Sequence, residues 1–307
     1  LLLVTLWNNW KNNNNLNKEK MILVTGSTGN LGKAVVTQLL KKTTASNIAV
    51  LARDVNKTID FKKAGVEVRV GDFDNPSSLL KALNGIDQVL LISGTDPVNR
   101  FLQHKNVVDA ALKNGIKRIA YTSIAMNDFS ISSNQFLMQS HFQTEDYIKA
   151  SQVNYTFYRN NLYADTILMF AGENPFETGI NLPTEHGKVS FALRREIGEA
   201  IANDLLISES GNRIYQMTGF QSYSFSDIAF ELSKISGSDV NYNDLKAIEY
   251  KEILKKYEIP EEYIEIYSAF TEDIKNNQHN IISSDLEKLL GRKPIQLSDA
   301  LKELYNL

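Results

Sequence analysis

The sequence predicts an α/β protein in which a doubly wound parallel sheet is followed by a smaller, helix-rich C-terminal lobe. From Met21 to about residue 160, short apolar runs alternate with amphipathic stretches. This alternation is typical of βαβ units, whose helices cover both faces of a parallel sheet. Beyond Asn160 the alternation stops, and the last part, roughly Asn243–Leu307, is helix-rich, acidic and rich in tyrosine.

Six apolar runs are the expected strands, because each is short, aliphatic and bounded by turn formers. They are Met21–Thr25, Ile48–Ala52, Val66–Val70, Gln88–Ser93, Arg118–Ser123 and Val153–Arg159. The stretches between them have apolar residues at helical spacing. The expected helices are Gly29–Lys42, one capped by Asn75 with Pro76 in its first position, Val98–Lys113 and Ser133–Ala150.

The C-terminal part is expected to interleave with the sheet domain. Its predicted elements are a helix over Ile197–Ile207, a strand over Arg213–Thr218, and a helix capped by Ser226 and ended by Gly237. The charged run Lys246–Glu265 is interpreted as a solvated helix face. We divide the chain into a leader (1–20), a sheet domain (21–160) and a lobe (161–307), with no clean linker.

Composition excludes several classes of function. The 307 residues carry a formal net charge of -3, which provides no broad basic field for nucleic acid or anionic membranes. No apolar run approaches the roughly 18 residues that span a bilayer. The sequence has no cysteine and its four histidines lack ligand spacing, so no metal site is expected. We expect a cytoplasmic monomer or homodimer that acts on a small molecule.

The first residues, Leu1–Lys20, do not fit the sheet pattern. They open with LLLV, without methionine, and continue into the asparagine-rich WNNWKNNNNLNKEK. A signal peptide would place positive charge before its apolar run, whereas here the lysines follow. A low-complexity asparagine run cannot pack a core. We therefore expect a disordered or artefactual extension, with Met21 as the native start.

The strongest motif is Gly26-Ser27-Thr28-Gly29-Asn30-Leu31-Gly32, which follows an expected strand and opens an expected helix. Glycines in that context predict a dinucleotide site of the Rossmann type. Gly26 permits the tight turn, and Gly29 lets the backbone approach a pyrophosphate held at the helix N-terminus. Gly32 lets the helix pack closely on the sheet.

The end of the second strand carries Arg53 and Asp54, at the distance from the glycines where cofactor preference is set. An acidic residue there binds the ribose 2′-hydroxyl of NAD, whereas an arginine accommodates the 2′-phosphate of NADP. A guanidinium holds a phosphate bidentately, and Lys57 could add charge. NADP(H) is therefore the expected cofactor, and Asp54 leaves NAD(H) possible.

Two further strand ends converge on the same crevice, because ligands of open α/β sheets bind at the carboxyl ends of the strands. Asp72 and Phe73 follow the third strand and are expected near the adenine, although Asp72 could instead cap a turn. Ile92–Gly94 follows the fourth strand, where small residues let the backbone run beside the ribose.

Several segments together resemble the NmrA-like branch of the atypical short-chain dehydrogenases, and within it the bacterial NAD(P)H:quinone oxidoreductases and triphenylmethane reductases. They are MILVTGSTGNLG, LARD, AGVEVRVGDFDNPSSL, GIDQVLLISG, HKNVVDAALKNGIKRIAYTS, SHFQTEDYIKAS and VNYTFYRNNLY. The resemblance implies a Rossmann domain with a smaller substrate-binding lobe, NADPH as the cofactor, and reduction of quinones or cationic aromatic dyes.

The resemblance also implies which residues hold the dinucleotide. They are Gly26, Ser27, Thr28, Gly29, Asn30, Leu31, Arg53, Asp72, Phe73, the Ile92–Asp96 loop with Ser93 and Gly94, and Thr122. On the nicotinamide side it implies Asn160, which is also a candidate catalytic residue, and Tyr163.

One departure from ordinary short-chain dehydrogenases affects the expected mechanism. Those enzymes carry Tyr-x-x-x-Lys on the helix after the fifth strand, and alignment with that helix puts Leu137 and His141 at the two positions. The proton donor for a ketone is therefore missing, whereas a quinone or an extended cation tolerates the loss. His141 is hypothesised to orient the nicotinamide ribose or a substrate oxygen, with Glu145 one turn later holding it. A purely structural histidine is the alternative.

Two other groups of residues have both a functional and a structural interpretation. Tyr223, Tyr263, Tyr267 and Phe270 could form a wall for a flat substrate, or the core of the lobe. Arg194, Arg195 and Glu196 match a family segment that borders the substrate cleft, or they form surface ion pairs.

The sequence thus predicts an NAD(P)H-dependent reductase that transfers hydride to a quinone-like or conjugated aromatic acceptor. Catalysis would depend on proximity and orientation, because no strong general acid is present. The alternative is an NADP(H)-binding redox sensor of the NmrA type that acts through a protein partner. Loss of the Tyr-x-x-x-Lys pair fits that alternative too, and argues against a sugar-nucleotide epimerase.

Overall fold

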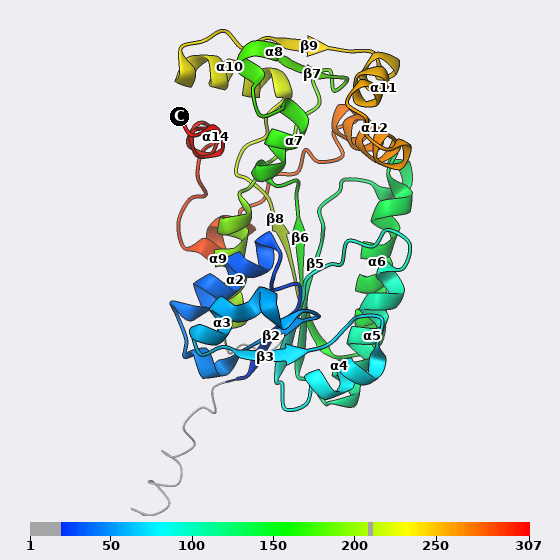
Figure 1. The fold of residues 1–307 in the computed structure, drawn as a ribbon, viewed down its shortest axis with the longest axis vertical. Coiled ribbons are helices and arrows are strands. Elements are labelled where there is room, and N and C mark those ends of the chain that lie inside the picture. The colour runs from blue at the N-terminus through cyan, green and yellow to red at the C-terminus, as the bar shows by residue number, and fades with distance from the viewer. Residues whose placement is uncertain (1–19, 208–210) are drawn as a thin grey trace, which may run out of the picture.

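The computed structural model describes residues 20–207 and 211–307, so the predicted leader lies outside the described residues except for Lys20. A seven-stranded parallel sheet forms the centre (Figure 1). In spatial order its strands are β3 (Glu67–Val70), β2 (Ile48–Ala52), β1 (Ile22–Val24), β4 (Gln88–Leu91), β5 (Arg118–Ile124), β6 (Asn154–Asn160) and β8 (Arg213–Met217). The strand order reverses between β1 and β4, which creates a crevice at their carboxyl ends.

Helices cover both faces of this sheet, which confirms the predicted doubly wound α/β fold (Figure 1). One face carries α2 (Asn30–Leu40), α9 (Arg194–Leu205) and α13 (Asp285–Leu290). The other carries α4 (Pro76–Ala82), α5 (Arg100–Lys113) and α6 (Gln135–Ala150), while the short α3 (Ile59–Lys63) links β2 to β3. Each layer buries its own hydrophobic core against the sheet, as the helical spacing of apolar residues predicts.

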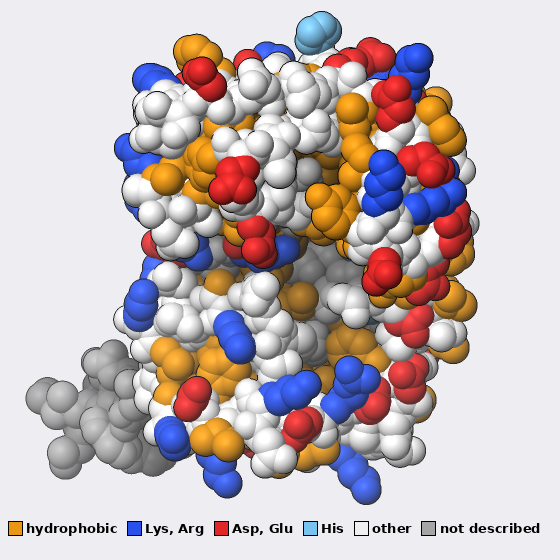
Figure 2. Space-filling model, turned by 45° about the horizontal axis from the view of Figure 1, so that its top comes forward, with side chains coloured by type: hydrophobic (Ala, Val, Ile, Leu, Met, Phe, Trp, Pro, Cys, Tyr) orange, Lys and Arg blue, Asp and Glu red, His pale blue; other side chains and the backbone are white. Residues whose placement is uncertain are grey.

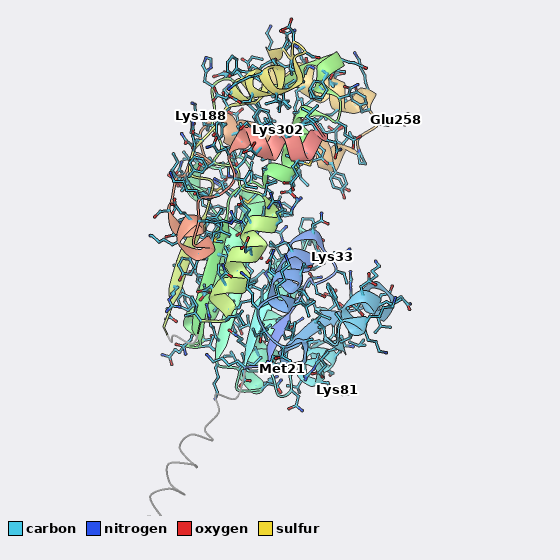
Figure 3. The ribbon with its side chains drawn as sticks, turned by 90° about the vertical axis from the view of Figure 1, so that its left-hand side faces the viewer. Met21, Lys33, Lys81, Lys188, Glu258 and Lys302 are labelled. Atoms are coloured by element: carbon cyan, nitrogen blue, oxygen red, sulfur yellow. The ribbon has the colours of Figure 1, made fainter. Side chains whose placement is uncertain are left out.

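A smaller lobe lies beyond the carboxyl ends of the strands and has its own hydrophobic core (Figure 1). It contains α7 (Ile167–Ala171), α8 (Pro175–Thr178), α10 (Phe225–Ser236), α11 (Ala247–Lys256), α12 (Glu261–Lys275) and α14 (Leu297–Tyr305). A two-stranded parallel sheet of β7 (Ile180–Leu182) and β9 (Tyr242–Asp244) was not expected. Figure 3 shows Lys188 and Lys302 at this end of the molecule, and Met21 and Lys81 at the opposite end.

The helix cap expected at Ser226 is wrong by two residues. Ser224 is the cap: its hydroxyl accepts a hydrogen bond from the Asp227 amide at 3.1 Å, and the Asp227 carboxylate accepts from the Ser224 amide at 2.9 Å. This reciprocal arrangement satisfies two otherwise unpaired amides, which Ser226 inside the first turn cannot do. The helix does end at Gly237, which adopts a left-handed conformation with φ 72°.

The charged run Lys246–Glu265 does not form a single helix face. It spans α11 and the first turns of α12, which are separated by a turn in which Glu258 adopts φ 57°. Pro260 then caps α12, because proline cannot donate the amide that a continuous helix would need. Within residues 20–207 and 211–307, none of the helices combines the length and hydropathy needed to cross a bilayer.

Candidate functional site

A pocket with a volume of about 310 Å³ opens at the carboxyl ends of β1 to β4. Eight of the predicted cofactor residues line it, namely Gly26, Thr28, Arg53, Asp72, Phe73, Gly94, Thr95 and Asp96. The space-filling view shows the surface hollowed between the lobe and the sheet domain (Figure 2). The pocket therefore lies at the topological switch point, where the fold predicts a ligand.

The glycine turn forms the floor of this pocket. Gly26 adopts φ 58°, a left-handed conformation, and its carbonyl accepts a hydrogen bond from the Gly29 amide at 3.0 Å. Gly29 is the N-cap of α2, and no side chain caps the helix. The first amides of α2 are thus available to an anion, and the helix dipole favours negative charge there. This arrangement fits a diphosphate.

Three side chains predicted to contact the cofactor are directed elsewhere. The buried hydroxyl of Ser27 donates to the Leu51 carbonyl at 3.2 Å, and Leu31 packs into the core beneath α2. The hydroxyl of Thr122 accepts from the Ser93 amide at 2.9 Å. These side chains hold the loops in place, whereas Gly26 and Thr28 of the glycine turn line the pocket.

Arg53 and Asp54 have different roles at the end of β2. Arg53 lines the pocket, and among the described residues no carboxylate forms an ion pair with it. Asp54 does not line the pocket, because its carboxylate accepts from the Asn56 amide at 2.9 Å and caps a short 3-10 turn. The position that decides between the two cofactors therefore presents a cation, as a 2′-phosphate requires.

The sequence did not identify two polar residues of the pocket, Asp74 and Gln103. The Gln103 amide donates to both carboxylate oxygens of Asp74, at 3.2 and 3.1 Å, and to Asp96 at 3.4 Å. The signal in the sequence that could have identified Gln103 is its position in the first turn of the helix after β4. Asp72 does cap a turn, since it accepts from the Asp74 amide at 3.1 Å, and it also lines the pocket.

Asn160 and Tyr163 come together at the carboxyl end of β6. The buried amide of Asn160 donates to the Tyr163 hydroxyl at 3.0 Å, and no described residue bonds the Asn160 Oδ1 atom. The Arg194 guanidinium lies over the Tyr163 ring at 4.5 Å from its centroid. Burial raises the pKa of Tyr163, so its hydroxyl stays protonated and remains able to donate. Neither residue lines the 310 Å³ pocket.

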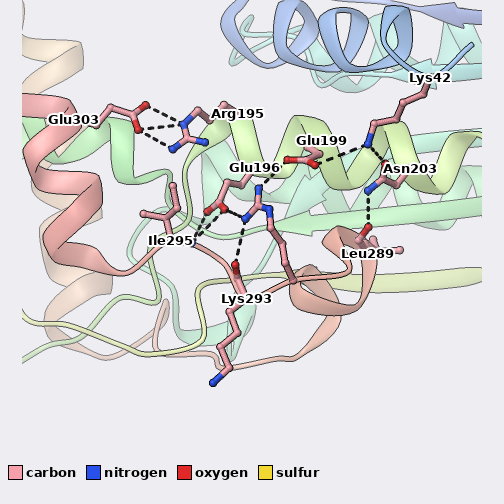
Figure 4. A network of polar contacts seen from close by, with 10 residues as sticks. Lys42, Arg195, Glu196, Glu199, Asn203, Leu289, Lys293, Ile295 and Glu303 are labelled. Atoms are coloured by element: carbon pink, nitrogen blue, oxygen red, sulfur yellow. Dashed lines mark hydrogen bonds and ion pairs between the residues drawn. The ribbon is translucent and has the colours of Figure 1, made fainter.

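Arg195 and Glu196 both form ion pairs (Figure 4). Arg195 binds Glu303 on the surface, with the closest atoms 2.7 Å apart. Glu196 is buried and accepts from Arg292 and from the Ile295 amide. The ion-pair interpretation therefore holds for both residues.

The aromatic residues of the lobe are mainly structural. Tyr223, Tyr267 and Phe270 pack against its hydrophobic core, whereas Tyr263 is 47% exposed. The core interpretation is favoured for the first three side chains. The part of the chain that the structure describes contains no group of three or more His, Asp or Glu side chains placed to hold a metal ion.

The expected contact between Glu145 and His141 is wrong. Glu145 is buried and accepts two hydrogen bonds from the Arg159 guanidinium, at 2.9 and 2.6 Å. The partner of His141 is Tyr121, whose hydroxyl lies 3.0 Å from the Nδ1 atom. Burial raises the pKa of Tyr121, so the phenol keeps its proton and can donate to Nδ1. The imidazole proton would then reside on Nε2.

We predict that His141 stays neutral throughout the physiological pH range. Burial, followed by the positive charge of Arg100, lowers its pKa well below 6.5. Burial also lowers the pKa of His104 to about 3 and that of His279 to about 4. An NMR titration of the imidazole C–H signals from pH 8 to 5.5 should leave these three unshifted, and a His186→Gln variant assigns the remaining, exposed histidine.

The sign of the accompanying stability change follows from the same depressed pKa values. The unfolded chain takes up protons on these rings near pH 6.5, whereas the folded protein does not. Stability should therefore fall as the pH drops below about 6.5. A melting temperature that is equal at pH 7 and pH 5, or a shift of the His141 signal near pH 6.5, would contradict the lowered pKa values.

Comparison with known proteins places this geometry in a family. The model of the NmrA-like family matches residues 18–301. Quinone oxidoreductase 2 of Escherichia coli (strain K12) is 31% identical over 292 residues, which cover 94% of this chain and 99% of the relative.

Two solved structures have the same fold over nearly the whole chain. Triphenylmethane reductase of Citrobacter sp., complexed with NADP(H), is 36% identical with a TM-score of 0.86, covering 92% of this chain and 99% of its own. The NADPH-dependent quinone oxidoreductase of Escherichia coli, complexed with NADPH, is 29% identical with a TM-score of 0.87, covering 93% and 100%. The chain therefore belongs to the NmrA-like family.

Proposed function

We propose that this protein is an NAD(P)H-dependent reductase that passes hydride to a quinone-like or conjugated aromatic acceptor. One observation carries the proposal: the same pocket is lined by Gly26 and Thr28, in the turn that leads directly into the uncapped helix α2, and by Arg53, with which no described carboxylate forms an ion pair. These are the two groups that a diphosphate and a 2′-phosphate need. Relatives with this fold are a quinone oxidoreductase and a dye reductase that bind NADP(H).

Different residues of the chain bind and orient different parts of the cofactor. The amides of α2 hold the diphosphate, Arg53 holds the 2′-phosphate, and Asn160 with Tyr163 lines the nicotinamide side. When bound, NADPH supplies the hydride, and the protein supplies position and exclusion of water.

No described residue at the site is placed as a strong acid, because His141 is neutral and Leu137 replaces the usual tyrosine. An acceptor that delocalises the incoming charge suits such a site. His141 is proposed to donate a hydrogen bond from Nε2 to the nicotinamide ribose or to an acceptor oxygen.

The proposal also covers the division of the chain into domains, the kind of substrate, the location of the protein and its oligomeric state. Residues 21–160, with α9, β8 and α13, form the cofactor domain, and the rest of 161–307 forms the substrate lobe. The substrate is a small molecule. We place the protein in the cytoplasm, as a monomer or homodimer.

The test is NADPH oxidation by the purified protein, with benzoquinones and cationic triphenylmethane dyes as acceptors. We expect steady turnover with at least one acceptor class, and Arg53→Ala should raise the KM for NADPH about tenfold or more, because a charge-assisted contact to phosphate is lost. The KM for NADH should change little.

The control variant is Lys63→Ala, which removes one exposed cation at the end of α3, outside the pocket lining. Tight NADPH binding without turnover on any acceptor would favour the redox-sensor alternative. An equal response of both cofactors to Arg53→Ala would refute the 2′-phosphate assignment.

A further inference from the structure

The loop after β4 leaves the sheet with three consecutive backbone amides, each bound by a side chain from a different element. The amides are those of Ile92–Gly94. Their acceptors are the hydroxyls of Thr25 and Thr122, at 3.0 and 2.9 Å, and the Nε2 atom of His104, at 2.9 Å. The path of this wall of the pocket is therefore set by side chains and not by strand pairing.

The hydrogen bonds fix which nitrogen of His104 carries the proton. Nε2 accepts from the Gly94 amide, so it is unprotonated. The Thr144 hydroxyl donates to the Ser140 carbonyl at 2.7 Å, so its oxygen accepts from Nδ1–H of His104, at 2.9 Å. Burial holds the pKa of His104 at about 3, so this neutral form persists. His104 therefore connects α6 to the loop after β4 through two hydrogen bonds in one fixed tautomer.

Two neighbours of His104 on α5 hold the adjoining loop. The Asn106 amide donates to the Phe73 carbonyl at 2.9 Å, behind the loop that follows β3. Gln103 joins Asp74 of that loop to Asp96 of the next one. The side chains of α5 thus fasten both loops that face each other across the pocket, and the loops carry Asp72, Phe73 and Gly94 of its lining.

The loop after β4 is in van der Waals contact with Gln103 and His104 at Gly94. A Cβ atom on Gly94 would lie 3.4 Å from Gln103 and 3.7 Å from His104. The imidazole makes edge contacts with the rings of Phe73 and Tyr121, at centroid distances of 6.4 and 5.3 Å. His104 itself has no exposed surface and does not line the pocket.

We propose that Gln103, His104 and Asn106 form a positioning bracket that fixes the adenosine side of the cofactor pocket. This inference rests on the proposed function, because it takes the pocket beside Arg53 as the place of the adenosine 2′-phosphate. His104 is its central member and a positioning residue, since it acts through the Gly94 amide. Without that acceptor, the part-buried Gly94 amide loses its protein partner, and any movement of the loop reshapes the wall of the pocket.

Two substitutions of His104 distinguish the effect of losing the hydrogen bond to Gly94 from the effect of losing the packed imidazole ring. His104→Gln places an amide oxygen near the former Nε2 position and can still accept from Gly94. His104→Asn reaches only the Nδ1 position, so it keeps the Thr144 contact and leaves the Gly94 amide unpaired. Both remove the same aromatic ring. Lys105→Ala is the control on the same helix, where Lys105 pairs with Asp109 at the surface.

The readouts are the dissociation constants of NADPH and of adenosine 2′,5′-bisphosphate, the KM and kcat with a benzoquinone, and the melting temperature. His104→Asn should weaken both ligands about tenfold, raise the KM for NADPH and leave kcat at saturation within about twofold. His104→Gln should bind both ligands within about threefold of the unmodified protein, and Lys105→Ala should be unchanged.

The outcomes distinguish this inference from the function on which it rests. Suppose that the unmodified protein binds NADPH, and that His104→Asn and His104→Gln have the same dissociation constant for each ligand. The bracket is then refuted and the reductase proposal stands. A loss of kcat without a change in either dissociation constant also refutes it. If the unmodified protein binds neither ligand, the cofactor assignment itself fails.

Discussion

Replacing Gly32 with alanine should destabilise the protein by about 3 kcal/mol or more, at the upper end of what overpacking costs. A Cβ atom at this position would lie 2.6 Å from the Cα atom of Ser27 and 2.8 Å from the carbonyl carbon of Gly26, and closer still to the Gly26 oxygen. All three are backbone atoms of the glycine turn, so no side chain can rotate away. Urea or thermal unfolding measures the loss.

Gly29→Ala is the matched variant in the same turn. Its Cβ atom would meet nothing closer than the Gly26 oxygen, at 3.4 Å, and Gly29 has an ordinary φ of -80°. Its stability should fall by no more than about 1 kcal/mol, the usual difference between N-cap residues. NADPH binding should nevertheless weaken strongly, because the new methyl group occupies the approach of the diphosphate. If Gly29→Ala binds NADPH as tightly as the unmodified protein, Gly29 has no role in cofactor binding.

These two glycines illustrate what the sequence could establish. The turn, the strand before it and the helix after it depend on neighbouring residues, so spacing alone predicts them. The position of Arg53 was equally predictable from the sequence, because its distance from the glycines follows from the length of one βαβ unit. The structure places Gly26 and Arg53 in the lining of one pocket, as their spacing along the chain predicts.

Other roles depend on partners far away in the sequence. Gln103 faces the pocket only because Asp74, 29 residues earlier, lies across from it. The helical i,i+4 rule assigned Glu145 to His141, but the rule cannot foresee that Arg159 on β6 offers a bidentate guanidinium. The strand β9 was missed because its three residues, Tyr242–Asp244, contain no apolar run.

Replacing Asp204 with alanine should cost about 3 to 5 kcal/mol of stability, because it leaves a buried guanidinium without its counter-charge. Asp204 lies on α9 with no exposed side-chain surface, and its carboxylate binds Arg118 at the start of β5. It also accepts from the Tyr158 hydroxyl at 2.5 Å. Burial, followed by the neighbouring carboxylate, raises the pKa of Tyr158 well above 10, so this hydroxyl donates at all working pH values.

Asp204→Asn should cost less than Asp204→Ala, since an amide oxygen still accepts from Tyr158. The control is Glu303→Ala, which breaks the surface pair with Arg195, whose side chains are 44% and 48% exposed. Exposed pairs contribute about 0 to 1 kcal/mol, so this variant should melt almost normally. Chemical denaturation with a linear free-energy analysis gives all three values.

A double variant, Arg118→Met with Asp204→Leu, decides which physical effect dominates. If the loss in Asp204→Ala comes from the uncompensated charge, removing both charges restores much of the stability, because buried ion pairs seldom exceed apolar packing. If the double variant is no more stable than Asp204→Ala, the loss comes from packing and hydrogen bonds. Arg118 enters β5 at its amino end, at the edge opposite the pocket. NADPH affinity should therefore remain unchanged in every folded variant, which separates this stabilising network from the cofactor site.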